Sequence, residues 1–138
     1  MTTEPIADRL LMPNDPDQAR TYREYIVCYA TPVIAEDISA GISEWDPDAR
    51  VHLCSAPEEA LDLLRRRPQV HALISAEPPA ELASSGLLRT LGGKGGRLVW
   101  LATREDIDTA EVDTSVIALD VPFTTATLHA ALSKLGDG

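Results

Sequence analysis

Aromatic residues are scarce in this sequence, which has two tryptophans, three tyrosines and one phenylalanine, or 4% of 138 residues. Hydrophobic residues still make up 44% of the chain, which is enough for a folded core and argues against disorder. The core must therefore be built from leucine, isoleucine, valine and alanine. A chain of this length fits one domain.

Basic residues are also few. Twelve lysines and arginines stand against 22 aspartates and glutamates, so the net charge is −10. Binding of nucleic acid by phosphate neutralisation needs a patch of basic side chains, and we therefore expect no nucleic-acid partner. The one basic run, Arg65–Arg67, ends a predicted helix, where it complements the negative end of the helix dipole.

Long apolar runs are missing. No stretch approaches the ~20 residues that a membrane span needs, and the first 18 residues lack the basic start and apolar region of a signal peptide. We expect a cytoplasmic protein without membrane contact. Cytosolic disulfides are rare, so Cys28 and Cys54 are predicted to be buried free thiols.

Metal-ligand spacing is absent from the sequence. His52, His71 and His129 are isolated from one another, and no Cys-x-x-Cys pair occurs. The glycine-rich segment 92–96 lacks the Gly-Lys-Ser/Thr ending of a phosphate-binding loop and follows a predicted helix, so we expect a turn there. We expect no cofactor, no metal and no enzymatic activity.

Short apolar segments alternate with helical patterns from residue 23 onward. The predicted strands are Tyr25–Tyr29, Arg50–Cys54, Val70–Ser75, Leu98–Leu101 and Val116–Leu119. Such alternation predicts an α/β fold, in which a five-stranded parallel sheet is covered by helices on both faces. Residues 1–22 are predicted to be an N-terminal extension, and residues 23–138 are predicted to form the domain.

The helices between these strands are predicted from proline, capping and spacing signals. The first begins at Pro32, the second follows a capping box over Ser55–Glu58, and the third runs from Leu82 to Leu91. Glu105–Ser115 is predicted to be a short, irregular helix, because its apolar positions are sparse. Thr124 or Thr125 is predicted to cap the last helix.

The order and spacing of several short motifs resemble the receiver domain of response regulators over about residues 23–136. Residues 27–32, VCYATP, lie where receivers carry two apolar residues, an acidic pair and a proline. Residues 55–61 are similar to the family's S-x-x-E-A-L helix opening, and residues 85–91 to its D-G-L-x-L-L-x-x-L. Val121-Pro122-Phe123 followed by Leu128 is similar to the closing K-P-F-x(4)-L.

The resemblance implies a flavodoxin-like strand order, 2-1-3-4-5, and a cis peptide bond before Pro122. In such sheets, ligand sites lie at the carboxyl ends of the strands. The residues directly after each predicted strand are therefore the candidates for a functional site.

At this edge the sequence departs from the receiver pattern in every position that handles phosphate. Tyr29 and Ala30 replace the acidic pair that holds Mg²⁺ in receivers, and neither residue offers a carboxylate to a hard cation. Ala76 replaces the phosphoacceptor aspartate, and a methyl group cannot attack a phosphoryl donor. Ala102 and Val121 replace the switch Ser/Thr and the lysine. We therefore predict a degenerate phosphoacceptor pocket.

A shift of one residue changes little. It would bring Glu77 to the acceptor position or Thr103 to the switch position, but no shift restores an acid after the first strand. The resemblance then implies a non-phosphorylatable module of bacterial two-component or related signalling. Its partner would be a histidine kinase, a phosphotransfer protein or another signalling domain, and a homodimer stays open.

A second function stays open beside this interaction module. The emptied pocket near Tyr29, Ala76 and Ala102 could serve a small-molecule sensor. A filled, apolar pocket would favour the interaction module, whereas an open cavity with convergent polar groups would favour the sensor.

Receivers commonly signal through the fourth helix, fifth strand and fifth helix. In this sequence the fourth helical segment is acidic, and Asp106, Asp108 and Glu111 form the candidate partner face. A solvated acidic loop that keeps the protein soluble is the alternative interpretation of the same charges.

Overall fold

The computed structural model describes residues 22–110 and 115–135, so nearly all of the predicted N-terminal extension lies outside the described residues. Five strands form one sheet in the order β2-β1-β3-β4-β5, and each neighbouring pair is parallel. The strands are Glu24–Cys28 (β1), Arg50–Cys54 (β2), Ala72–Ser75 (β3), Arg97–Ala102 (β4) and Ile117–Asp120 (β5). The predicted fold class and strand order are confirmed.

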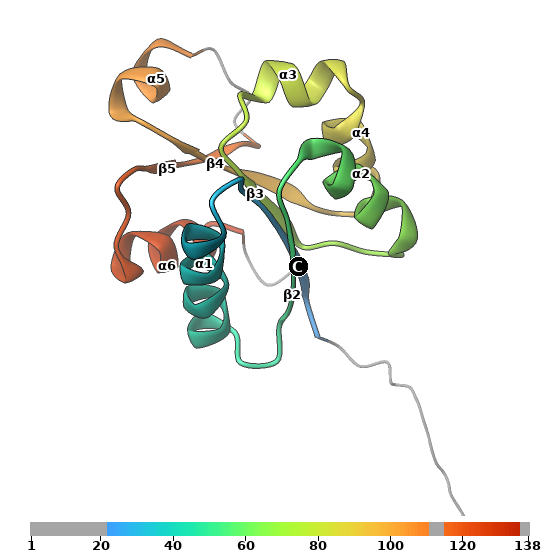
Figure 1. Cartoon of the computed structure of the whole chain (residues 1–138), viewed down its shortest axis with the longest axis horizontal. Helices are drawn as coiled ribbons and strands as arrows, with labels where there is room; N and C mark the ends of the chain where they lie inside the picture. Colours follow the sequence, from blue (N-terminus) through green and yellow to red (C-terminus); the bar gives the residue numbers. More distant parts are fainter. Residues whose placement is uncertain (1–21, 111–114, 136–138) are drawn as a thin grey trace, which may run out of the picture.

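Helices lie on both faces of the sheet (Figure 1). One face carries α1 (Pro32–Trp45) and α6 (Thr125–Ser133), which pack against each other. The other face carries α2 (Pro57–Arg66), α3 (Pro79–Ser84), α4 (Leu87–Gly93) and α5 (Arg104–Thr109). Within the described ranges, none of these helices has the length and apolar character needed to cross a membrane.

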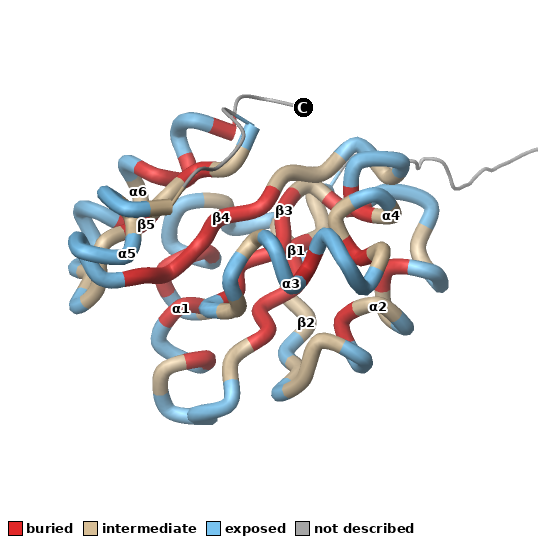
Figure 2. Tube along the Cα trace, turned by 90° about the horizontal axis from the view of Figure 1, so that it is seen from above, coloured by how far each residue is buried: buried red, intermediate tan, exposed pale blue. Residues whose placement is uncertain are grey.

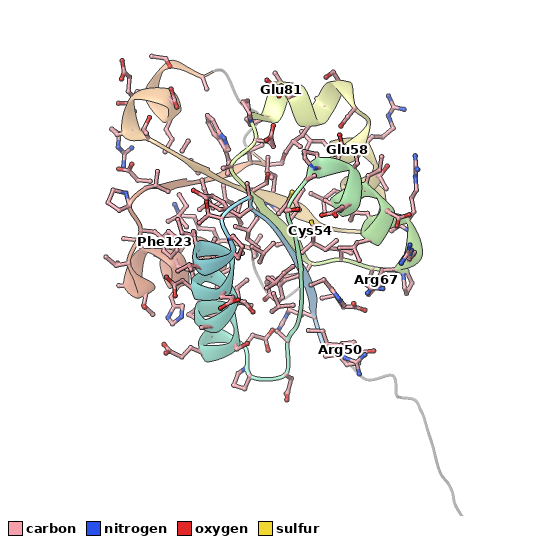
Figure 3. All side chains as sticks on the ribbon, in the orientation of Figure 1. Arg50, Cys54, Glu58, Arg67, Glu81 and Phe123 are labelled. Atoms are coloured by element: carbon pink, nitrogen blue, oxygen red, sulfur yellow. The ribbon has the colours of Figure 1, made fainter. Side chains whose placement is uncertain are left out.

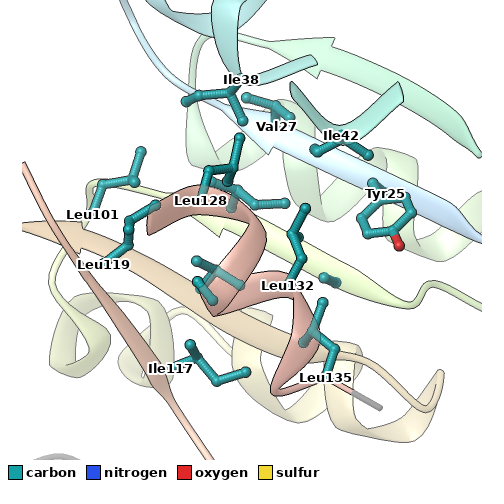
Figure 4. Close-up of a cluster of buried hydrophobic side chains, with 14 of the residues drawn as sticks. Tyr25, Val27, Ile38, Ile42, Leu101, Ile117, Leu119, Leu128, Leu132 and Leu135 are labelled. Carbon is teal, nitrogen blue, oxygen red and sulfur yellow. The ribbon is translucent and has the colours of Figure 1, made fainter. Parts of the chain in front are cut away.

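The sheet separates two apolar clusters, and β1 contributes to both because successive side chains of a strand point to opposite faces. Tyr25 and Val27 face the cluster under α1 and α6 (Figure 4), while Ile26 and Cys28 face the cluster under α2 and α4. The central strands are buried along their length (Figure 2). This double burial explains why they are continuous apolar runs instead of alternating ones.

Three local predictions were wrong. The capping box does not form, since the N-cap of α2 is Ala56, and Ser55 instead donates to Glu59 from its backbone amide at 2.8 Å and from its hydroxyl at 3.2 Å. The predicted third helix is two helices, because Gly86 between α3 and α4 has a φ of 84°. That left-handed backbone, which glycine adopts without steric cost, interrupts the helix.

The third strand starts later than predicted. It begins at Ala72, and His71 precedes it with its ring packed edge-on against Tyr25 at a centroid distance of 5.4 Å. Other predictions are confirmed. Thr124 caps α6 through a reciprocal pair of hydrogen bonds with Thr127, and α5 is only six residues long.

Candidate functional site

The predicted pocket residues lie along one edge of the sheet, where the parallel strands end. Tyr29 and Ala30 directly follow β1, and Ala76 directly follows β3. Ala102 is the last residue of β4, and its carbonyl accepts a hydrogen bond of 3.0 Å from the amide of Val121, which follows β5. The fold therefore brings together five positions that the sequence separates by up to 92 residues, from 29 to 121.

The side chains at this edge are mostly apolar. Tyr29 is half-buried and packs, like Val121 and Phe123, against the cluster under α1 and α6. Ala30 and Ala76 are exposed, while Ala102 is buried. The Val121–Pro122 peptide bond is cis, as the resemblance implies.

Ser75 and Glu77 flank Ala76 and are linked to each other. Ser75 is fully buried, and its hydroxyl oxygen accepts a hydrogen bond of 3.1 Å from the amide of Glu77. This local bond stabilises the turn after β3 and occupies the serine hydroxyl as an acceptor. Within the described ranges, no three side chains of histidine, cysteine, aspartate or glutamate come together as a group that could hold a metal ion.

Thr103, the alternative switch residue, has a structural role. It is the N-cap of α5, and its hydroxyl oxygen accepts a hydrogen bond of 3.2 Å from the amide of Asp106. Removal of such a cap typically costs a helix about 1 kcal/mol. The neighbouring Arg104 pairs with Asp120 at the end of β5 at 3.4 Å, an exposed contact that sequence reasoning did not predict.

The candidate partner face lies only partly within the described residues. Asp106 and Asp108 are exposed on α5, beside the equally exposed Glu105. Asp108 is 3.9 Å from Arg104 one helical turn earlier, and an exposed pair of this kind contributes little to stability. Glu111 lies outside the described residues.

Two cysteines meet at the same edge, a feature that sequence reasoning missed. Cys28 ends β1 and Cys54 ends β2, and the register of the two strands places them directly opposite each other. Both thiols are free, but only Cys28 is buried, whereas Cys54 was predicted to be buried and is half-exposed. Figure 3 shows Cys54 between β2 and the start of α2.

A charged cluster lies toward the opposite end of β1 and β2. Glu24 Oε1 lies 2.8 Å from His52 Nε2 and pairs with Arg67 Nε at 3.2 Å. The three side chains are largely shielded from solvent, with exposed fractions of 17–24%. Arg67 is the C-cap of α2 and also contacts this charged cluster. The basic residues in the last turn of α2 are Arg65 and Arg66.

No protein-family model matches the sequence, and no curated protein matches it. Solved structures do resemble the fold. A response regulator receiver protein from Sinorhizobium medicae is 17% identical, with a TM-score of 0.61 over 83% of this chain and 94% of that chain. The chemotaxis response regulator CheY4 of Vibrio cholerae is 15% identical, with a TM-score of 0.65 over 83% of this chain and 99% of that chain. The chain therefore has the receiver-domain fold.

Proposed function

We propose that this chain is a pseudo-receiver, a signalling module that accepts no phosphate and acts through contacts with other proteins. The observation that carries the proposal is the packing of Tyr29. Where receivers hold Mg²⁺ with an acidic pair, this chain places a half-buried phenol against the apolar cluster under α1 and α6. A phenol offers no carboxylate to a hard cation, so the end of β1 lacks the ligands that Mg²⁺ prefers.

Phosphoryl transfer depends on charge neutralisation as much as on a nucleophile. Ala76 provides no nucleophile, and Glu77 beside it is a carboxylate without an adjacent acidic pair to bind a metal. A carboxylate alone cannot offset the negative charge that develops on the transferring group. The same reasoning supports a role without enzymatic activity.

A module without phosphoryl chemistry can act by recognition of another protein. The two fold neighbours are named as response regulators, so we propose a cytoplasmic role in two-component or related regulation. The partner would be a histidine kinase, a phosphotransfer protein or another signalling domain. The exposed acids Glu105, Asp106 and Asp108 make α5 a docking face for a partner with a basic surface.

The test has two arms. The full chain is incubated with Mg²⁺ and acetyl phosphate, or with Mg²⁺ and beryllofluoride, beside a receiver that retains its acidic pair and aspartate. We expect the control to form an adduct and this chain to form none, by intact mass and by chemical-shift changes. A stoichiometric Mg²⁺-dependent adduct on this chain would disprove the absence of phosphorylation.

The second arm tests recognition. The immobilised full chain is exposed to a lysate of the native organism, and bound proteins are identified by mass spectrometry. The matched control carries Asp106→Asn and Asp108→Asn. We expect a signalling protein that the wild type retains and the control loses. If both variants retain the same proteins equally, α5 is not the docking face.

A further inference from the structure

The two cysteines lie directly opposite each other at the carboxyl ends of β1 and β2. Cys28 and Cys54 are register partners on parallel strands, so their side chains leave the sheet on the same face. Both residues belong to the apolar cluster under α2. The hydrogen bonding between β1 and β2 extends to these two residues, because the amide of Tyr29 donates to the carbonyl of Cys54 at 3.0 Å.

Strand spacing places this pair within reach of a covalent bond. Neighbouring strands lie roughly 4.8 Å apart, and disulfides join α-carbons separated by roughly 4.4–6.8 Å. The two thiols lie close enough to shift each other's pKa, that of Cys28 upward and that of Cys54 downward. Closing the bond therefore requires little movement of the backbone.

The two thiols are chemically unequal. Cys54 is half-exposed at the end of β2, whereas Cys28 is buried. The hydrogen bond from the Cys28 thiol, aided by the backbone amide of Ala56, lowers the pKa of Cys54. The same interaction with Cys54, together with burial, raises the pKa of Cys28. A reactive outer thiol therefore stands next to a protonated inner one.

We propose that Cys28 and Cys54 form an oxidisable thiol pair, a modification site at which a hydroperoxide produces a reversible disulfide between β1 and β2. This site is independent of the proposed signalling function. It lies at the same edge of the sheet, because Tyr29 follows Cys28 directly.

The reaction balances with hydrogen peroxide as the oxidant. The Cys54 thiolate attacks one peroxide oxygen, the O–O bond breaks, and the released hydroxide takes a proton to become water. The Cys28 sulfur then attacks the sulfenic sulfur of Cys54. The S–S bond forms as the S–O bond breaks, and the departing hydroxide leaves as water with the proton of Cys28. Two thiols and one peroxide give one disulfide and two waters.

A disulfide between Cys28 and Cys54 would restrain the ends of β1 and β2, where the chain departs from the receiver pattern. It would join the turn that contains Tyr29 and Ala30 to the turn that contains Ser55 and leads into α2. The acids whose charges act on the pair are Glu59, whose carboxylate binds Ser55, and Glu77 after β3. Their negative charges favour small neutral oxidants such as peroxide over anionic disulfides such as oxidised glutathione.

The test uses the reduced full chain treated with hydrogen peroxide. We expect both thiols to disappear together, with a mass loss of about 2 Da, a Cys28–Cys54 crosslink in the peptide map and full reversal by dithiothreitol. Two outcomes would overturn the proposal: both thiols still reactive after treatment, or oxidation confined to products between chains.

Variants that keep one cysteine each test whether Cys28 and Cys54 react as a pair or whether one of them reacts independently of the other. Cys54→Ser should leave Cys28 unreactive toward iodoacetamide in the folded protein, whereas Cys28→Ala should leave Cys54 reactive. The pH midpoint of Cys54 alkylation should rise in Cys28→Ala, because the donated hydrogen bond is lost. An unchanged midpoint, or equal reactivity of the two thiols, would contradict the assignment. Circular dichroism verifies that both variants are folded.

Discussion

Gly41 of α1 lies so close to Leu128 of α6 that a Cβ at position 41 would come within 2.4 Å of Leu128 Cδ2. Leu128 is 1% exposed, so its side chain cannot move away into solvent. His129, the next residue of α6, donates a hydrogen bond of 2.9 Å from Nε2 to the carbonyl of Gly41. The two helices on this face of the sheet therefore pack so closely that a larger residue at position 41 would force Leu128 to shift.

A side chain at position 41 should destabilise the fold. We expect Gly41→Val to lower the free energy of unfolding by about 1–3 kcal/mol, the usual cost of forcing extra atoms into a packed core, as measured by urea denaturation. Gly92→Val in α4 is the control, because nothing lies within 4 Å of a Cβ at that position. Equal stabilities for the two variants would contradict the close packing of α1 and α6.

Arg67 should matter to stability and Arg66 should not. Arg67 pairs with the largely shielded Glu24 at 3.2 Å, while Arg66 pairs with the exposed Asp62 one helical turn earlier. Removing a charged side chain that hydrogen-bonds to a partly buried partner lowers the free energy of unfolding by about 1–2 kcal/mol. We therefore expect Arg67→Ala to cost that amount and Arg66→Ala to cost less than about 0.5 kcal/mol. Thermal and urea denaturation of both variants provide the measurement.

Stability should fall at strongly alkaline pH through Tyr25. Burial, with the nearby carboxylate of Asp46, raises the pKa of Tyr25 from its ordinary 10.0 to about 12. The unfolded chain then loses the phenol proton at a lower pH than the folded chain does. The stability contributed by the neutral phenol is complete below pH 10.0 and is lost as the pH rises toward about 12.

Tyr25→Phe provides the comparison. The unfolding free energy of the wild type should decrease relative to that of the variant between these two pH values. The tyrosinate absorbance of the wild type should also contain a late component that Tyr25→Phe lacks. Parallel stability curves for the two proteins across this range would show that Tyr25 titrates alike in the folded and unfolded chains.

Restoring the acceptor alone should not restore phosphorylation. We expect Ala76→Asp to form no adduct with acetyl phosphate and Mg²⁺, because no acidic pair follows β1 to hold the metal. A variant that combines Ala76→Asp with Tyr29→Asp and Ala30→Asp is the smallest one in which we expect labelling. Incorporation by the single variant at the rate of an ordinary receiver would refute this account of the site.

The acidic face should control how fast a partner binds. Neutralising Asp106, Asp108 and Glu111 together should lower the association rate of the partner obtained by pull-down, since exposed charges mainly steer encounter. Association of the wild type should slow as salt rises from about 0.05 to 0.3 M. The melting temperature should change little, because Asp106 and Asp108 are exposed. A variant that binds at the wild-type rate would place docking on another surface.

The sequence by itself determined the architecture. Apolar runs such as Tyr25–Cys28 alternate with helical segments. A parallel sheet covered by helices on both faces buries every side chain of such a run. The sequence also shows directly that Tyr29 and Ala30 follow β1 and that Ala76 follows β3. These features depend on residue type and local order, which the sequence displays directly.

Only the tertiary structure decided which distant side chains meet. Cys28 and Cys54 become neighbours because α1 returns the chain to the sheet in one particular register, and a shift of one residue would point Cys54 to the other face. Glu24, His52 and Arg67 meet for the same reason. Gly41 looks like an ordinary helical glycine until α6 packs against it. Register and helix packing arise from contacts across the whole core, and no local pattern encodes them.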